Sequence, residues 1–430
     1  MFILKTNPEG SQEIGVRIKP LMKVDEAKER ILRSMPVMPG EEISITEALG
    51  RVTSCNIYSR RTQPPAALSA MDGYAIRFSD ITDIPSEFIR VGSAKAGGSY
   101  PGTLNQNETV RIFTGAPVPT GADTIVIQEN VDAENENDGT HVVVRERPQK
   151  GRYIRSLGLD FNKGELGIQE GKKLTSRDIG LAAAMNIPWL SVSRRPKIAI
   201  LATGDEIIRP GESINKDQIV SSNSYTLSAL VKAAGGEPII LGIAPDTIDG
   251  IQSFFKNKVG ADLIITTGGA SVGEHDLIQK ALGKESFGED GLDLDFWRIA
   301  MRPGKPLIFG QINNTPILGL PGNPVSTMVC GAVFVRPAID KMLGIYSDQK
   351  SEAKALLAEP VPENDERQDY IRAITFINKE GIKVVKAFDH QDSSMMKVLA
   401  QANCLIIRPP FDSKRSIGDE VKLIEFKDGF

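Results

Sequence analysis

The stretch KIAILATGDE (197–206) joins an unbroken apolar run to a glycine and two carboxylates. Two further apolar runs, PIILGIA (238–244) and DLIITT (262–267), follow it, and segments with helical spacing lie between the three runs. Unbroken apolar strands are typical of a parallel sheet that is covered on both faces. Their βαβαβ order therefore predicts a doubly wound α/β domain, closed by a helix that ends near residue 343.

The regions on either side of this domain have short apolar runs broken by glycine, proline and asparagine. From Ile43 to His141 the pattern predicts a β-rich lobe, with the polar segment AENENDGT (133–140) at the tip of a hairpin. Residues 347–430 alternate short strands with turns and predict a small β-barrel. Apolar residues at helical spacing predict helices over residues 22–35 and 176–185.

The composition of the 430-residue chain narrows the class of protein. With 40% hydrophobic and 25% charged residues, the chain can bury sizeable cores. A net charge of −4 argues against nucleic acid as a partner, but a local cluster could still hold an anionic ligand. Cys55, Cys330 and Cys404 form no CxxC pair, which disfavours disulfides and structural zinc and indicates a reducing, cytoplasmic environment. The sequence contains neither an apolar signal segment at its start nor a run of about 18 apolar residues, so no membrane association is predicted.

Glycines and carboxylates follow two of the predicted parallel strands. Glu206 ends the segment TGDE, and TTGGASVGEHD (266–276) places Gly268, Gly269 and Ser271 before Asp276. Open α/β sheets bind ligands at the carboxyl ends of their strands, and glycine-rich turns can point backbone N–H groups at a phosphate. A carboxylate beside phosphates indicates Mg²⁺ or water activation. The alternatives are plain turns and, for Asp276, an N-terminal helix cap.

Three cations surround a Pro-Gly turn in the segment FWRIAMRPGKPLIFG (296–310). Strand alternation would place Arg298 and Arg302 on one face, and together with Lys305 they could converge on a tetrahedral oxyanion. A solvated strand face is the alternative interpretation.

Three further turns combine glycine with polar residues. LPGNPVS (320–326) joins a strand to a helix through Pro321, Gly322 and Asn323, and it fits a helix cap as well as a ligand loop. In the lobe, SAMDGYAI (69–76) places Asp72 before a glycine, and IFTGAPVPTGAD (112–123) does the same with Thr114. Each of the last two could serve only as a turn.

Taken together, seven segments resemble the MoeA family, which includes a domain of gephyrin. SAMDGYAI, IFTGAPVPTGAD, TGDE, SNS, TTGGASVGEHD, MRPGKP and LPGNPVS occur in the family's order, and the resemblance covers about residues 20–430. It implies an elongated homodimer with four-part subunits. After an N-terminal extension (1–20), the parts would be a connecting domain (21–53 and 150–186), the β-rich lobe (54–149), a MogA-like molybdopterin-binding α/β domain (187–346) and a C-terminal β-barrel (347–430).

The resemblance also implies a site between the α/β domain of one subunit and the lobe of the other. The positions that match the family's functional residues are Asp72, Thr114, Glu206, Asp246 and Asp276, then Arg298, Arg302 and Lys305, and in the barrel Arg367 and Ser393. Arg298 and Arg302 stand where relatives often have lysine, which changes reach and hydrogen-bond geometry. Ser393 follows HQD, where a glycine before the serine is familiar in the family.

The implied reaction is the insertion of molybdate into adenylylated molybdopterin with release of AMP, which completes molybdenum cofactor synthesis. The glycine turns would hold the substrate, Mg²⁺ would bridge phosphate to Glu206, Asp246 or Asp276, and the basic residues would gather molybdate or tungstate. The alternatives are an adenylyltransferase of the MogA type, a nucleotide pyrophosphatase resembling CinA, and a gephyrin-like scaffold. The lobe and barrel argue against the first alternative, and the lack of a long linker argues against the last.

Overall fold

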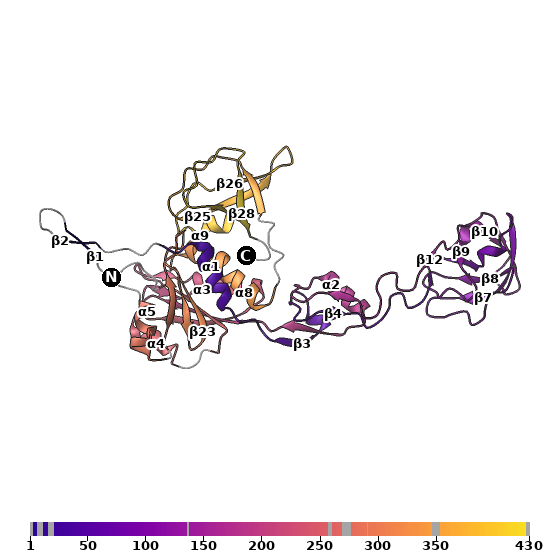
Figure 1. Cartoon of the computed structure of the whole chain (residues 1–430), viewed down its shortest axis with the longest axis horizontal. Helices are drawn as coiled ribbons and strands as arrows, with labels where there is room; N and C mark the ends of the chain where they lie inside the picture. Colours follow the sequence, from indigo (N-terminus) through magenta and orange to yellow (C-terminus); the bar gives the residue numbers. More distant parts are fainter. Residues whose placement is uncertain are drawn as a thin grey trace. The chain divides into compact units, whose positions relative to one another are not determined.

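The computed structural model describes residues 3–6, 12–15, 21–135, 137–256, 260–268, 277–289, 291–345 and 353–426. Their contacts divide the chain into two compact units, one of residues 1–40 with 193–430 and one of residues 41–192. Figure 1 labels the elements of both units. The four-part division with its bounds remains a prediction from the sequence.

A six-stranded sheet forms the centre of the α/β part of the first unit. Its order is β18 (Glu237–Ala244), β15 (Lys197–Thr203), β19 (Leu263–Thr267), β23 (Thr315–Leu320), β22 (Ile308–Ile312) and β20 (Asp293–Trp297). The first four strands are parallel, and β22 and β20 run antiparallel to their neighbours. Because β15 pairs with β18 on one side and β19 on the other, the predicted doubly wound arrangement is confirmed.

Helices cover this sheet on both faces, as its apolar strands predict. On one face, α4 (Ile248–Ser253) and α5 (Leu277–Leu282) pack on Ala199, Leu201 and Ile264. The other helices are α3 (Asn223–Ala234), α6 (Lys284–Phe287), α7 (Pro324–Cys330) and α8 (Arg336–Met342), with a π-helical turn (Gly331–Val335) between the last two. The predicted closing helix and the predicted first helix, α1 (Val24–Ser34), are confirmed, and α1 lies against α8.

The C-terminal part of the first unit is a closed five-stranded barrel, as predicted. β25 (Gln368–Ile377), β26 (Lys383–Ala387), β24 (Ala353–Leu357), β28 (Glu420–Glu425) and β27 (Cys404–Arg408) are neighbours in that order, and β27 pairs back to β25. The short helix α9 (Met396–Gln401) precedes β27. The two-residue strand β21 (Met301–Arg302) leaves the α/β part and joins β25 in parallel, so a backbone ladder connects the two parts.

The second unit contains the predicted β-rich lobe. Its six strands are ordered β10 (Val131–Ala133), β11 (His141–Val144), β7 (Ser86–Ala94), β8 (Glu108–Ile112), β6 (Gly73–Ile76) and β9 (Thr124–Ile127). The antiparallel pair β10–β11 encloses the segment 133–140, so the predicted hairpin is confirmed. Alternate residues of the sheet, such as Tyr74 and Ala75, enter two separate apolar clusters, so both faces of the sheet are covered.

The rest of the second unit surrounds a helix that was also predicted. This helix, α2 (Ser176–Ala184), begins at Thr175 with a reciprocal capping box that Asp178 completes. Around it are the short strand pairs β3 (Gly40–Ser44) with β14 (Trp189–Ser193) and β4 (Ile57–Tyr58) with β13 (Leu166–Ile168). The pair β5 (Leu68–Ser69) with β12 (Ile154–Arg155) lies beside the lobe. Smaller pairs elsewhere in the chain are β1 (Ile3–Thr6) with β2 (Gln12–Gly15) and β16 (Ile207–Ile208) with β17 (Ile219–Val220).

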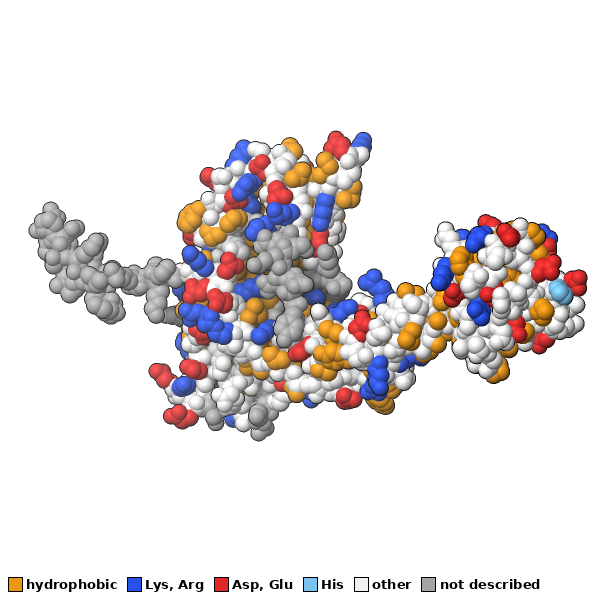
Figure 2. Space-filling view, turned by 45° about the vertical axis from the view of Figure 1, so that its right-hand side comes forward, with side chains coloured by type: hydrophobic (Ala, Val, Ile, Leu, Met, Phe, Trp, Pro, Cys, Tyr) orange, Lys and Arg blue, Asp and Glu red, His pale blue; other side chains and the backbone are white. Residues whose placement is uncertain are grey.

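The surface carries charges of both signs. Figure 2 shows acidic and basic side chains interspersed over the face that it presents, which is what the small net charge of −4 predicts. Within the described ranges, no helix has both the length and the apolar character needed to cross a membrane.

Candidate functional site

A cleft of about 1390 Å³ lies between the α/β part and the barrel of the first unit. Its floor is formed by the carboxyl ends of β15, β19 and β23, where an open α/β sheet binds ligands. The turn 302–306, residues 219–223 and barrel residues from 359–362, 369–372 and 387–396 supply the wall. Of the residues predicted from the sequence, the cleft brings together Glu206, Asp246, Gly268, Arg302, Lys305, Pro321, Gly322, Asn323 and Ser393.

Carboxylates gather at one end of this cleft. Glu206 and Asp246 both line it, and the backbone N–H of Asp246 donates to Asp205 Oδ1 at 3.1 Å. Burial raises the pKa of Asp246, and the neighbouring charges of Glu206 and Asp205 raise it further. A cation would relieve this repulsion, so Glu206 and Asp246 suit Mg²⁺, which commonly uses one or two carboxylates together with phosphate oxygens.

The third predicted metal ligand cannot be placed beside them. Asp276, like Gly269 and Ser271, lies outside the described residues. Within the described ranges, no group of three or more His, Cys, Asp or Glu side chains is arranged to hold a metal ion. The predicted roles of these three residues therefore stay predictions.

The predicted phosphate turn begins with a glycine that the packing requires. Gly268 has φ +93°, and a Cβ on it would lie only 2.3 Å from the carbonyl oxygen of Thr203. Gly268 thus lies directly against the end of β15. The hydroxyl of Thr267, the last residue of β19, donates to the carbonyl oxygen of Pro321 at 3.3 Å, which links the end of β19 to the LPGN turn.

The LPGN turn itself contacts the barrel. Pro324 is the first residue of α7, as its sequence position predicts, but Asn323 makes no side-chain cap to the helix. Its amide Nδ2 instead donates to Ser393 Oγ at 3.0 Å, and the backbone N–H of Val325 donates to the carbonyl oxygen of Ser393 at 3.1 Å. The Asn323 side chain thus holds Ser393 in the cleft and does not cap the helix.

The basic segment is arranged differently from the prediction. The expectation that strand alternation places Arg298 and Arg302 on one face is wrong, because β20 ends at Trp297 and Arg298 has φ +76°. Its guanidinium lies 3.9 Å from the centroid of the Trp297 ring, and Arg298 does not line the cleft. Arg302 belongs instead to β21, next to the barrel strand β25, and both Arg302 and Lys305 line the cleft.

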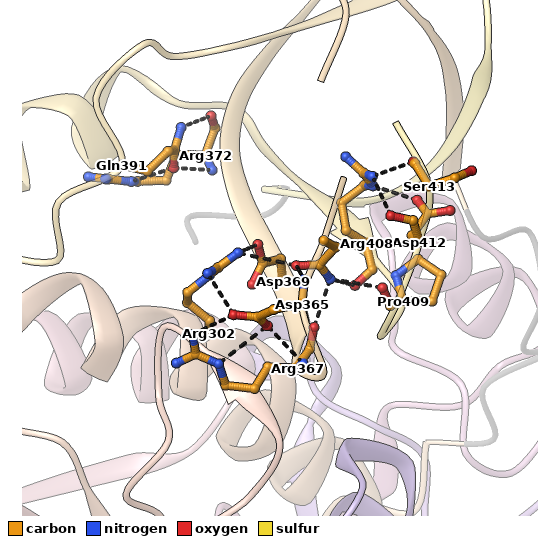
Figure 3. A network of polar contacts seen from close by, with 11 residues as sticks. Arg302, Asp365, Arg367, Asp369, Arg372, Gln391, Arg408, Pro409, Asp412 and Ser413 are labelled. Atoms are coloured by element: carbon orange, nitrogen blue, oxygen red, sulfur yellow. Dashed lines mark hydrogen bonds and ion pairs between the residues drawn. The ribbon is translucent and has the colours of Figure 1, made fainter. Parts of the chain in front are cut away.

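Barrel carboxylates bind two of the predicted anion-gathering arginines (Figure 3). Arg302 forms ion pairs with Asp369 and, at 3.0 Å, with Asp365. Arg367 Nη2 lies 2.7 Å from the same Asp365 carboxylate, and Arg367 does not line the cleft. The hydrogen bond from Arg367 and the nearby Arg302 charge lower the pKa of Asp365 to about 2. Asp365 and Asp369 lie 63 and 67 residues after Arg302 in the sequence, so the segment around Arg302 does not indicate that they are its partners.

Arg372 is a cleft residue that sequence reasoning missed. It is 1% exposed, and its guanidinium donates to the carbonyl oxygens of His390 (3.2 Å), Asp392 (2.9 Å) and Met395 (3.1 Å). These contacts fix the loop that carries Ser393. Burial lowers the pKa of Arg372. The available signal was a single arginine inside the apolar strand YIRAITFI, where an unpaired charge is costly.

The two predicted lobe residues lie together in the second unit. Asp72 Oδ1 accepts hydrogen bonds from the backbone N–H of Thr114 at 2.7 Å and from its hydroxyl at 2.8 Å. These bonds, the backbone one first, lower the pKa of Asp72. The two turns therefore form one small anionic feature. Whether it reaches a cleft in another subunit remains a prediction.

Comparisons with known proteins cover nearly the whole chain. Three family descriptions match in sequence: the MoeA N-terminal region (domain I and II) over residues 22–186, a probable molybdopterin binding domain over 199–341, and the MoeA C-terminal region (domain IV) over 354–426. A molybdopterin molybdenumtransferase of Haemophilus influenzae is 32% identical, over 94% of this chain and 99% of the relative. A gephyrin of Dictyostelium discoideum is 30% identical, over 93% of this chain and 62% of the relative. The crystal structure of a molybdopterin biosynthesis MoeA protein from Pyrococcus horikoshii superposes with a TM-score of 0.80 at 26% identity, covering 95% of this chain and 100% of that one.

Proposed function

Since this chain belongs to the MoeA family of molybdopterin molybdenumtransferases, we propose that it inserts molybdate into adenylylated molybdopterin and releases AMP. It is accordingly a transferase of molybdenum cofactor synthesis. The observation that carries the proposal is the cleft, in which loops from distant parts of the sequence bring carboxylates, a glycine turn, a lysine and a barrel serine together. A substrate with phosphates, a heterocycle and an incoming oxyanion needs all of these groups in one place.

The carboxylate end of the cleft would receive the phosphates. Glu206 and Asp246 would hold Mg²⁺ together with Asp276, and the ion would neutralise charge on the phosphoanhydride that is cleaved. Backbone N–H groups of the turn that begins at Gly268 would bind phosphate oxygens, with Gly269 and Ser271 continuing this contact. Asp276 would orient the attack. Its assignment rests on the family resemblance.

The opposite wall would gather the molybdate. Lys305, Asn323 and Ser393 line the cleft and offer donors to a dianion, which needs several charge-assisted hydrogen bonds to compete with water. Arg302 and Arg367 would have to exchange their Asp365 contacts to bind it directly, and Arg298 would have to leave Trp297. Lys305, Asn323 and Ser393 would therefore contact the molybdate directly, and Arg372 would hold the loop that carries Ser393.

We also propose that the protein acts as a homodimer in the cytoplasm. Large apolar side chains are exposed on the second unit, among them Leu157 at 60%, Leu159 at 63% and Trp189 at 56%. A second copy that covered these side chains would remove their apolar surface from water. A second copy would also bring Asp72 and Thr114 to the cleft. Light scattering coupled to gel filtration should give twice the 46.7 kDa chain mass.

Incubation with adenylylated molybdopterin, Mg²⁺ and molybdate tests the proposed function. We expect AMP release together with metal retention by the pterin, and a parallel reaction with tungstate shows which oxyanion is preferred. Asp276→Asn should abolish AMP release while substrate binding persists. Release of AMP at the wild-type rate by that variant would remove Asp276 from the mechanism. Formation of adenylylated pterin from ATP and molybdopterin would instead favour an adenylyltransferase.

A further inference from the structure

The amide of Asn223 connects the end of β19 to the LPGN turn at the floor of the cleft. Asn223 is the first residue of α3, and its Nδ2 donates to Thr267 Oγ1 at 2.9 Å and to the carbonyl oxygen of Gly322 at 2.7 Å. Thr267 precedes the glycine turn, and Gly322 lies in the LPGN turn. One side chain thus links the end of β19 and the LPGN turn to the start of α3.

These contacts determine which atom of the Asn223 amide is left to bind a ligand. A carbonyl oxygen only accepts hydrogen bonds, so the Asn223 atom that lies 2.7 Å from Gly322 must be the nitrogen. The other atom is therefore Oδ1, which only accepts. Oδ1 is buried and has no hydrogen-bond partner in the described part of the chain, although Asn223 lines the cleft. Leaving a buried acceptor without a donor is unfavourable, so Oδ1 favours a ligand that brings one.

The chemistry around Oδ1 selects the kind of donor. Phosphate and molybdate oxygens at neutral pH are themselves acceptors, so they cannot satisfy an amide oxygen. Ile219 and Val220, immediately before α3, also line the cleft and are 59% and 45% exposed, which provides an apolar surface for a planar ring. A second buried atom without a partner among the described residues, Thr203 Oγ1, also belongs to a residue of the cleft.

From these observations, and resting on the function proposed above, we propose that Asn223 Oδ1 accepts a hydrogen bond from the exocyclic amino group of the substrate's heterocycle, which packs on Ile219 and Val220. Both the pterin and the adenine of the proposed substrate carry such an amino group, so either ring could supply the donor. Asn223 would then be a substrate-binding residue that also links the end of β19 to the LPGN turn.

Binding of matched ligand pairs separates the two rings and tests the proposal. One pair is AMP and purine riboside 5′-monophosphate, which lacks the amino group. The other pair is pterin and 4-oxopteridine, which lacks the 2-amino group. Calorimetry on the full-length wild-type protein should show a preference of about tenfold for the amino-bearing member of one pair, because losing this hydrogen bond leaves a buried acceptor unpaired. The pair that shows the preference identifies the ring.

Two variants locate the preference at Asn223. Asn223→Ser and Asn223→Leu should bind both members of the sensitive pair within about twofold of each other, since leucine has no acceptor and the serine hydroxyl, one bond closer to the backbone, falls short of the position of Oδ1. Asn215→Ser, the same change at an exposed residue outside the cleft, should keep the wild-type ratio. The ratio is informative because a general loss of structure weakens both ligands alike, and the wild-type comparison requires no variant to fold.

The outcomes separate this inference from the proposed function. Wild-type turnover of adenylylated molybdopterin without a preference in either pair would overturn the Asn223 assignment alone. A preference that persists in both Asn223 variants would overturn it as well. A preference that depends on Asn223, in a protein that fails to release AMP from adenylylated molybdopterin, would support the heterocycle site and refute the proposed reaction.

Discussion

Alanine at position 268 should disturb the protein far more than alanine at a comparable glycine outside the cleft. Gly268 has φ +93°, and a Cβ there would lie 2.3 Å from the carbonyl oxygen of Thr203. Gly211 has nearly the same φ, +91°, but a Cβ there would meet nothing within 4 Å. The two substitutions therefore impose the same backbone strain and differ in the clash, so Gly211→Ala is a matched control.

The structure gives the size of the difference. The left-handed conformation costs alanine roughly 1–2 kcal/mol, and about 0.4–1 kcal/mol of this is offset because alanine restricts the unfolded chain. Gly211→Ala should thus lower the free energy of unfolding by about 1 kcal/mol. At position 268 the turn must also move by about 1 Å to reach ordinary contact, and such overpacking costs about 1–3 kcal/mol more. The expected loss for Gly268→Ala is therefore about 2–4 kcal/mol.

Urea unfolding followed by circular dichroism measures these losses, and AMP release from adenylylated molybdopterin measures the effect on the site. A displacement of about 1 Å in a positioning group can reduce the rate about 100-fold, so folded Gly268→Ala should be slow even where it is stable. If Gly268→Ala unfolded at the same urea concentration as Gly211→Ala and released AMP at the wild-type rate, the contact with Thr203 would not constrain the turn.

Three other perturbations give separate checks. Glu206→Gln removes a charge that raises the pKa of Asp246. A carboxyl with a raised pKa destabilises the fold above that pKa, so the variant should have a higher Tm than the wild type at pH 7 without Mg²⁺. Added Mg²⁺ should raise the Tm of the variant less than that of the wild type. Equal Tm values in both conditions would contradict this electrostatic coupling. Thr114→Val should bring the pKa of Asp72 partway back toward 3.8 in an NMR titration, since the larger backbone contribution stays. The stabilisation due to the lowered pKa of Asp72 is present at neutral pH and is lost as pH falls below 3.8. If the variant unfolded in acid at the same pH as the wild type, the Thr114 hydroxyl would not contribute to this stabilisation. Arg372→Met should lower the free energy of unfolding by about 3 kcal/mol, because three backbone carbonyl groups lose their donor. A loss under about 1 kcal/mol would show that the loop keeps its conformation without Arg372.

The parallel sheet could be predicted because its strands have a simple physical signature. A strand covered on both faces must be apolar throughout, and β15 occupies Lys197–Thr203, the same residues as the apolar run KIAILAT. The helices on either side of it follow from the same logic, since their apolar positions recur at helical spacing. The ends of the strands then place Glu206 and Gly268 at one edge without further information.

The partners of the charged residues could not be predicted in this way. The sequence shows Arg302 only as a cation near a turn, but in the structure it forms ion pairs with Asp365 and Asp369 of the barrel. Arg298 fits an alternating strand until a positive φ ends the strand one residue earlier. Both errors arise because tertiary contacts, which spacing does not encode, decide where a long side chain goes.

The roles of Asn223 and Arg372 could not be predicted for the same reason. Asn223 belongs to the motif SNS, yet its contacts with Thr267 and Gly322 cross 44 and 99 residues of sequence. Arg372 is a single charge in an apolar strand, and its acceptors are backbone atoms of a loop 18 to 23 residues later. A local pattern can mark such a position as unusual, but only the fold shows what it holds.

The short ladder between β21 and β25 has a mechanical consequence for substrate entry. Met301 and Arg302 pair with Gln368 and Asp369, so the α/β part and the barrel share a backbone seam beside the cleft. Opening of the cleft that keeps this ladder intact would turn about the seam. Lys305 follows the seam directly after the Pro-Gly turn, so its backbone would move less than the opposite rim in such an opening.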